Sequence, residues 1–107
     1  MKKLIIICPA YNEADKLPKL IDEFKKSNYL DNLFVVNSGS IDNSENILIQ
    51  NNVEHISLPV NKGGGYAIIK GIEHALNNDF EICCIIAGNG KMDPQEITKF
   101  IEKIEIE

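Results

Sequence analysis

The sequence lacks a long hydrophobic run. None of its apolar stretches approaches the roughly 20 residues that a membrane-spanning helix needs, so we predict no transmembrane segment in this chain. The apolar stretch at residues 4–8 is also too short for the core of a signal peptide, and a buried first strand explains it better.

The sequence also lacks the cysteine pairs and Cys/His clusters that form disulfides or bind zinc. The three cysteines, Cys8, Cys83 and Cys84, include no Cys-x-x-Cys pair, and the two histidines do not cluster. This pattern argues against a disulfide framework and against a zinc site. It is typical of a protein in a reducing compartment, so we expect a cytoplasmic location.

Basic charge is scarce as well. The chain has 11 basic residues against 16 acidic ones, which gives a net charge of −5. A protein that binds a nucleic-acid backbone needs a concentrated basic surface, so we predict no nucleic-acid partner. The sequence contains no P-loop, and the glycines at positions 63–65 do not have the spacing of a Gly-x-Gly-x-x-Gly fingerprint.

What the chain does have is a regular alternation of strand and helix patterns. Strands are expected at residues 3–8, 33–36, 54–58 and 82–86, and each is followed by a helical pattern. This order predicts an α/β fold, in which an open parallel sheet of about four strands has helices on both faces. The length of 107 residues suits a single domain covering residues 1–107.

Three of the helix starts carry capping residues. Asp15 is the expected cap of the first helix, Asp42 with Glu45 forms a capping box for the second, and Asp93 before Pro94 is the cap of the fourth. Capping alone explains both Asp42 and Asp93. Inside the third helix, at residues 66–76, a glycine at position 71 costs about 1 kcal/mol against alanine, which predicts close packing against another backbone.

Four polar loops are expected at one edge of the sheet. They are residues 9–13, 37–42, 59–65 and 87–93, and each follows a predicted strand. In open α/β sheets, ligands bind at the carboxyl ends of the strands. The three glycines at 63–65 would let backbone N–H groups approach a phosphate at the start of the third helix, although a plain turn explains them equally well.

These loops resemble the motifs of family 2 glycosyltransferases, which have the Rossmann-like GT-A fold. Residues 9–13, Pro-Ala-Tyr-Asn-Glu, resemble the family's opening motif, and residues 35–44 resemble its second-strand motif, Val-Asp-Asp-Gly-Ser-Thr-Asp-Asn-Ser. Residues 61–67 are similar to Asn-x-Gly-Lys-Gly-x-Ala. Residues 87–94 are similar to Asp-Ala-Asp-Gly-Gln-x-Asp-Pro, the metal-binding loop of polyprenyl-phosphate sugar transferases.

The resemblance implies transfer of a sugar from a nucleotide-diphosphate sugar to an acceptor hydroxyl, such as that of a lipid phosphate or a polysaccharide. It covers the whole chain but only the N-terminal donor half of the family's domain, so the acceptor half and its acidic general base are expected to be absent. The catalytic residues are therefore unknown, and this chain alone is expected to be inactive. The alternatives are a non-catalytic nucleotide-binding or interaction module and a homodimer that hides the surface of the missing half.

The family resemblance also implies Mg²⁺ or Mn²⁺, but this chain departs from the metal-binding pattern. The ligand positions are occupied by Ala87, Asn89 and Lys91, of which only Asn89 offers an oxygen, so any metal site is degenerate. One hypothesis is that the Lys91 ammonium replaces the cation beside the diphosphate, and the alternative is a solvated loop lysine. Ser38 occupies the position at which the family has the aspartate that binds the nucleobase.

The resemblance thus implies a nucleotide-sugar site at the carboxyl edge. Within it Tyr11 would stack on a nucleobase, or else be a partly buried loop aromatic, and Glu13 would line the pocket or simply favour the first helical turn. Lys62 would reach a phosphate or remain solvated. The site comprises Pro9, Ala10, Tyr11, Asn12, Glu13, Asn37, Ser38, Gly39, Ser40, Lys62, Gly63, Gly64, Gly65, Asn89 and Lys91.

Overall fold

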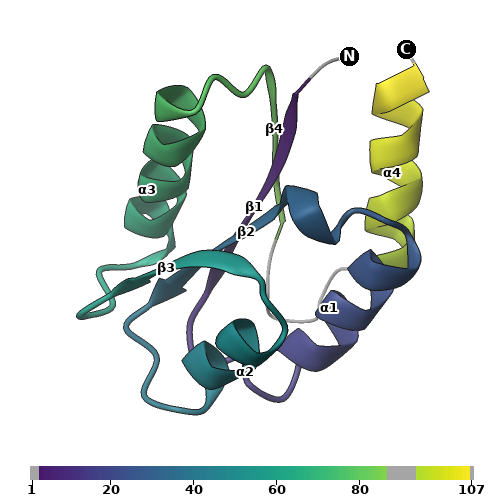
Figure 1. Ribbon diagram of the computed structural model, residues 1–107. Coiled ribbons are helices and arrows are strands. Elements are labelled where there is room, and N and C mark those ends of the chain that lie inside the picture. Colours follow the sequence, from purple (N-terminus) through teal and green to yellow (C-terminus); the bar gives the residue numbers. More distant parts are fainter. Residues whose placement is uncertain (1–2, 87–93, 107) are drawn as a thin grey trace.

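The computed structural model describes residues 3–86 and 94–106, in which strands and helices alternate (Figure 1). The predicted order of elements is confirmed. A short 3₁₀ turn (Leu30–Asn32) precedes the second strand. The elements are β1 (Leu4–Ala10), α1 (Leu17–Lys26), β2 (Leu33–Ser38), α2 (Ser44–Gln50), β3 (Glu54–Leu58), α3 (Gly64–Asn77), β4 (Ile82–Ile85) and α4 (Pro94–Ile106).

The four strands form one parallel sheet in the order β3-β2-β1-β4. Helices cover both faces, with α3 on one side and α1, α2 and α4 on the other (Figure 1). The α/β fold class predicted from the sequence is confirmed. The direction of the crossovers explains the layers, because the chain moves outward from β1 to β3 with α1 and α2 on one face and then returns to β4 with α3 on the other.

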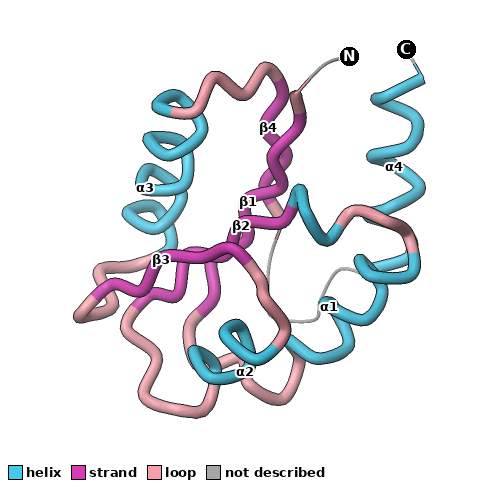
Figure 2. The backbone as a smooth tube through the Cα atoms, viewed as in Figure 1, coloured by secondary structure: helices cyan, strands magenta, loops and turns pink. Residues whose placement is uncertain are grey.

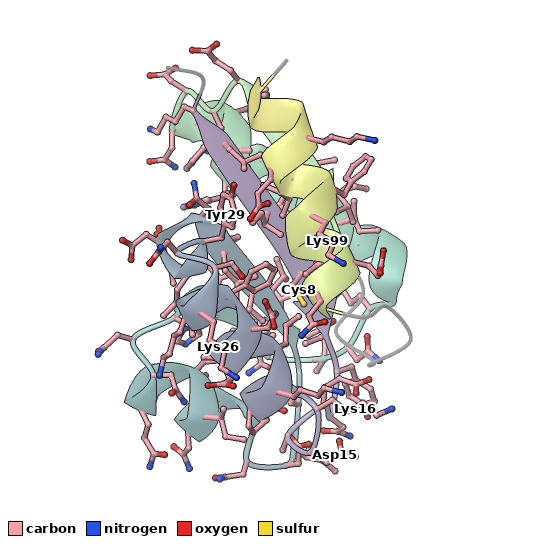
Figure 3. All side chains as sticks on the ribbon, turned by 90° about the vertical axis from the view of Figure 1, so that its right-hand side faces the viewer. Cys8, Asp15, Lys16, Lys26, Tyr29 and Lys99 are labelled. Atoms are coloured by element: carbon pink, nitrogen blue, oxygen red, sulfur yellow. The ribbon has the colours of Figure 1, made fainter. Side chains whose placement is uncertain are left out.

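The core consists of two apolar clusters, one on each face of the sheet. Side chains alternate along β1, so that Ile6 and Cys8 face α1 and α4 while Ile5 and Ile7 face α3. Both faces are buried, which explains the uninterrupted apolar run in the sequence. Burial raises the pKa of the Cys8 thiol to about 12, with a smaller contribution from Glu13, so this cysteine is an apolar core residue (Figure 3).

Two strands extend further than predicted. β1 continues through Pro9 and Ala10, and β2 continues through Asn37 and Ser38, because the ladder pairs Pro9 with Val36 and Ala10 with Asn37. Proline fits there since, among the described residues, the ladder between β1 and β4 ends at Ile7. Four residues of the candidate site therefore lie on strands, not in loops.

The helix caps only partly agree with the sequence analysis. The predicted Asp15 cap is wrong, because Lys16 occupies that position and the backbone carbonyl of Glu13 accepts from the N–H groups of Lys16 and Leu17, at 3.0 and 2.9 Å. At α2, Asn43 takes the N-cap position in place of Asp42. Asp93 lies outside the described residues. α4 starts at a proline, as predicted, and Pro18 lies in the first turn of α1.

The third helix starts earlier than predicted, at Gly64, and it packs closely at Gly71. A Cβ atom added at Gly71 would collide with Cγ2 of Ile7 on β1. Close packing is therefore confirmed, but the partner is a side chain of the central strand and not another backbone.

Candidate functional site

The loops that follow β1, β2 and β3 lie together at the carboxyl edge of the sheet (Figure 2). The chain leaves β1 in one direction, toward β2 and β3, and later returns to β4 on the other side of β1. In open α/β folds, ligands bind beside such a reversal of strand order. The loop after β4, which carries Asn89 and Lys91, lies outside the described residues.

Hydrogen bonds join the loop after β1 to the loop after β2. The backbone N–H of Asn12 donates to Oγ of Ser40 at 3.0 Å, and Oδ1 of Asn12 accepts from the backbone N–H of Ile41 at 2.9 Å. Asn12 has a φ of +52°, a left-handed conformation that asparagine tolerates better than most residues. A third bond runs from the backbone N–H of Ala14 to Oδ2 of Asp42, at 3.1 Å. We call these three bonds the loop clamp.

The loops after β2 and β3 are also joined. The hydroxyl of Ser38 donates to Oδ1 of Asn61 at 3.1 Å, and the same oxygen accepts from the backbone N–H of Gly63 at 2.9 Å. Because the hydroxyl of Ser38 donates its proton to this hydrogen bond, the Ser38 oxygen can act only as an acceptor toward any further partner.

Gly39 lets these two loops approach each other. A Cβ atom on this residue would lie 2.5 Å from the backbone nitrogen of Asn61 and 2.6 Å from the carbonyl carbon of Val60. Its φ of +69° is also in the left-handed region that favours glycine. Only glycine meets both requirements, so the backbone of this loop is held against the loop after β3.

Asn37 and Ser38, the last two residues of β2, are both buried, at 3% exposed each. Nδ2 of Asn37 donates to Oγ of Ser57 on β3 at 3.1 Å. Within the described part of the chain, Oδ1 of Asn37 has no hydrogen-bond partner. This side chain therefore belongs to the interior of the sheet beneath the loops.

The glycines at the start of α3 present an open stretch of backbone. Cβ atoms added at Gly63, Gly64 or Gly65 would meet no atom within 4 Å, and Gly63 has a φ of +93°. Beside them the ammonium of Lys62 lies 5.1 Å from the centre of the Tyr66 ring. Backbone N–H groups of a helix start and a nearby ammonium both attract an anion.

The structure brings most of the predicted site residues to one edge. Tyr11 is 44% exposed at the start of the loop after β1, whereas Ala10 is buried at the end of the strand. Sequence analysis missed two residues that hold this edge together, Asp42 and Asn61. Asp42 is predicted only as a helix cap. For Asn61 a signal was available, because it is the first residue of the motif at residues 61–67.

The carboxylate of Asp42 is held by several hydrogen bonds at this edge. Desolvation is the largest single influence on Asp42 and raises its pKa, but hydrogen bonds from the hydroxyl and backbone of Ser44, and from the backbone of Ala14, together outweigh it and hold that pKa below its usual value. Among the described residues, no group of three His, Cys, Asp or Glu side chains is arranged to hold a metal ion. In the same part of the chain, no helix is long and apolar enough to cross a bilayer.

Comparison with known proteins identifies the family. The family model described as glycosyl transferase family 2 matches residues 5–107. A UDP-N-acetylglucosamine–dolichyl-phosphate N-acetylglucosaminyltransferase from Methanococcus voltae is 29% identical over 96% of this chain and 47% of its own length. A dolichyl-phosphate beta-glucosyltransferase from Trichomonas vaginalis is 34% identical over 64% of this chain and 25% of its own length.

The chain spans less than half the length of these curated relatives. The match nevertheless runs through every described strand and helix of the fold, including the three loops at the carboxyl edge. The chain belongs to glycosyl transferase family 2.

Proposed function

We propose that this chain is the nucleotide-sugar-binding half of a glycosyltransferase that transfers a sugar from a nucleotide-diphosphate sugar to an acceptor hydroxyl. The observation that carries the proposal is the set of three strand-end loops, joined by hydrogen bonds beside the reversal of strand order. Family membership supports the reaction class. The names of two relatives support a polyprenyl phosphate of the dolichyl type as the acceptor.

Each loop has a separate task in this proposal. The exposed ring of Tyr11 stacks on the nucleobase. The oxygen of Ser38, whose proton is directed to Asn61, accepts a hydrogen bond from a base N–H group. The open backbone at Gly64 and Gly65 donates to the diphosphate at the start of α3, and Lys62 adds a positive charge.

Charge on the departing diphosphate has to be offset for the transfer to proceed. In the family a bound Mg²⁺ or Mn²⁺ supplies that positive charge. The described carboxylates do not fit such a cation, and the predicted degenerate ligand Asn89 lies outside the described residues. We assign no step to a metal ion. Direct neutralisation of the diphosphate by Lys91 stays a prediction.

A second candidate function is nucleotide binding without catalysis. The observation in its favour is that Asn37 and Ser38 stand where the family motif has two aspartates, so that both polar side chains at the end of β2 are neutral. A neutral acceptor still binds a base, but more weakly than a carboxylate. The two candidates share a nucleotide site and differ in turnover, which also needs the general base expected in the acceptor half.

Two further expectations stay predictions. One is a cytoplasmic location, which rests on the unpaired cysteines. The other is self-association, for which the exposed apolar residues Ile69, Ile72 and Leu76 on α3 provide a surface. Sedimentation of the purified chain over a range of concentrations tests self-association, and a monomer at every concentration would contradict it.

Calorimetric titration with UDP, GDP and their sugar derivatives, with Mn²⁺ and again with EDTA, tests the proposed function. We expect binding of at least one nucleotide. If the affinity in EDTA equals that in Mn²⁺, and Lys91→Ala loses this affinity, the result would support Lys91 in place of a metal ion. Binding that requires Mn²⁺ would contradict that role of Lys91. No binding of any nucleotide under either condition would refute the donor-site proposal.

A further inference from the structure

Asp42 connects two parts of the molecule, because its two carboxylate oxygens have different partners. Oδ1 accepts from the backbone N–H of Ser44 at 3.0 Å and from its hydroxyl at 2.6 Å, which orders the start of α2. Oδ2 accepts from the backbone N–H of Ala14 at 3.1 Å, in the loop after β1. The contacts with Ser44 use only Oδ1, so order at the start of α2 does not explain the contact that Oδ2 makes with Ala14.

The loop that Asp42 holds is the one that presents Tyr11. Ala14 lies three residues after Tyr11, between β1 and α1. The other two bonds of the loop clamp fix Asn12, which lies directly after Tyr11. Of the three bonds, the one to Asp42 has a charged acceptor, and such bonds are about twice as strong as neutral ones.

Ser44 orients the carboxylate of Asp42. Ser44 is fully buried and donates both its hydroxyl and its backbone N–H to Oδ1. With one oxygen held in this way, the other is directed at the loop after β1. Ordering a flexible loop before the ligand arrives reduces the entropy lost on binding, which raises affinity without a new contact to the ligand.

We propose that Asp42 is a positioning residue for nucleotide binding, which holds the loop after β1 so that Tyr11 faces the base. This inference rests on the proposed nucleotide site. Asp42 acts through Ala14 and makes no contact with the nucleotide itself.

Asp42→Asn separates the two roles of the side chain. The amide keeps one oxygen, which can continue to accept from Ser44, but its NH₂ group cannot accept from the N–H of Ala14. Asp42→Ser is a second variant, because a hydroxyl can still accept from the N–H of Ser44 two residues on but is too short to reach Ala14 in the same way. Asp15→Asn is the matched control, since Asp15 is an exposed aspartate of the neighbouring loop and its loss changes the net charge equally (Figure 3).

The experiment measures two quantities on the whole chain: hydrogen exchange of the Ala14 amide by NMR and the Kd for UDP by calorimetry. In Asp42→Asn and Asp42→Ser we expect Ala14 to exchange about tenfold faster and UDP to bind about tenfold more weakly, the factor given by the lower range for a charge-assisted hydrogen bond. Asp15→Asn should change neither quantity. Thermal unfolding of each variant confirms that it is folded at the temperature of the titration.

The outcomes separate the inference from the proposed function. Wild-type affinity for UDP in both Asp42 variants, despite faster exchange at Ala14, would overturn the positioning role while the nucleotide site stands. An equal loss of affinity in Asp15→Asn would also overturn it, because the effect would then come from net charge. A wild-type chain that binds no nucleotide would refute the proposed function and, with it, any positioning role.

Discussion

The carboxyl edge of the sheet and the outer flank of α3 and β4 differ sharply in the contacts that their side chains make. At the edge, polar groups from three loops hydrogen-bond to one another. On the flank, the exposed side chains are apolar, and in the described part of the chain they lack a covering element. They are Ile69, Ile72 and Leu76 on α3 and Cys83 and Ile85 on β4.

The apolar residues of the flank are exposed because α3 covers only part of the sheet. α3 faces the sheet with Ala67, Gly71 and Ala75, and it packs mainly over β1 and β2. The register pairs Cys83 with Ile5 and Ile85 with Ile7, so these two residues of β4 lie on the α3 side of the sheet. Hydrogen bonds between loops therefore order the edge, whereas the flank presents exposed apolar side chains of the kind found at protein–protein contacts.

The change that should break the edge most severely is Gly39→Ala. The new Cβ would collide with the backbone of Val60 and Asn61, and alanine disfavours the φ of +69°. We expect a loss of about 2–4 kcal/mol in the free energy of unfolding, from strain and overpacking together. Denaturant unfolding measures it. Gly64→Ala, at a site with open space, is the control, and an equal loss there would contradict the close approach of the two loops.

Asn61→Ala should have a smaller effect on the same edge. It removes the acceptor shared by Ser38 and Gly63, and the hydroxyl of Ser38 is then left buried without this partner. We expect a loss of about 1–3 kcal/mol in the free energy of unfolding. Asn61→Asp keeps an acceptor oxygen and should restore most of the stability. If Asn61→Asp is as unstable as Asn61→Ala, the shared acceptor does not hold these loops.

Acid should weaken the edge before it affects the flank, because a carboxylate, that of Asp42, joins two loops at the edge, whereas the exposed flank residues Ile69, Ile72, Leu76, Cys83 and Ile85 carry no carboxylate. The pKa of Asp42 is lowered from 3.8 in the folded protein, so its contribution to stability is complete above that value and is lost as pH falls through the lower folded pKa. Denaturant unfolding from pH 6 to about pH 2 tests this. The difference between wild type and Asp42→Asn should shrink toward the acid end, and a constant difference would contradict the prediction.

Leu76→Lys on the flank should change the stability of the monomer least. The side chain is 72% exposed, so we expect a change within about 0.5 kcal/mol in the free energy of unfolding. If the chain self-associates through the flank, the same substitution should weaken association, measured by sedimentation. Ile41→Lys is the control, because Ile41 is 88% exposed in a loop at the edge. Equal weakening by both variants would argue against the flank as the interface.

Sequence reasoning predicted the sheet well because the signals are local. The run at β1 is apolar throughout since both faces are buried, and the alternation of elements dictates a parallel arrangement. Strand ends were predicted poorly, because pairing of Ala10 with Asn37 depends on register between segments far apart in the chain. The Asp15 cap failed for a related reason: a backbone carbonyl, which has no side-chain signature, satisfied the N–H groups instead.

The sequence predicted which described residues lie at the carboxyl edge, but not the hydrogen bonds that join their loops. The motifs named the residues that gather at the carboxyl edge. The loop clamp joins positions that are 28 and 29 residues apart, and no local pattern indicates that the second oxygen of Asp42 reaches Ala14. The contact between Gly39 and Val60 likewise depends on how closely two loops approach, which only the fold determines.

The most direct test of the central claim is a site-resolved titration. UDP is added to the ¹⁵N-labelled chain, and amide shifts are followed at the edge and on the flank. We predict that the largest shifts occur at Asn12, Ser38 and Gly63–Gly65, with little change at Ile72, Leu76 and Ile85. Shifts centred on the flank, or none at the edge while UDP binds, would contradict the assignment of the carboxyl edge as the nucleotide site.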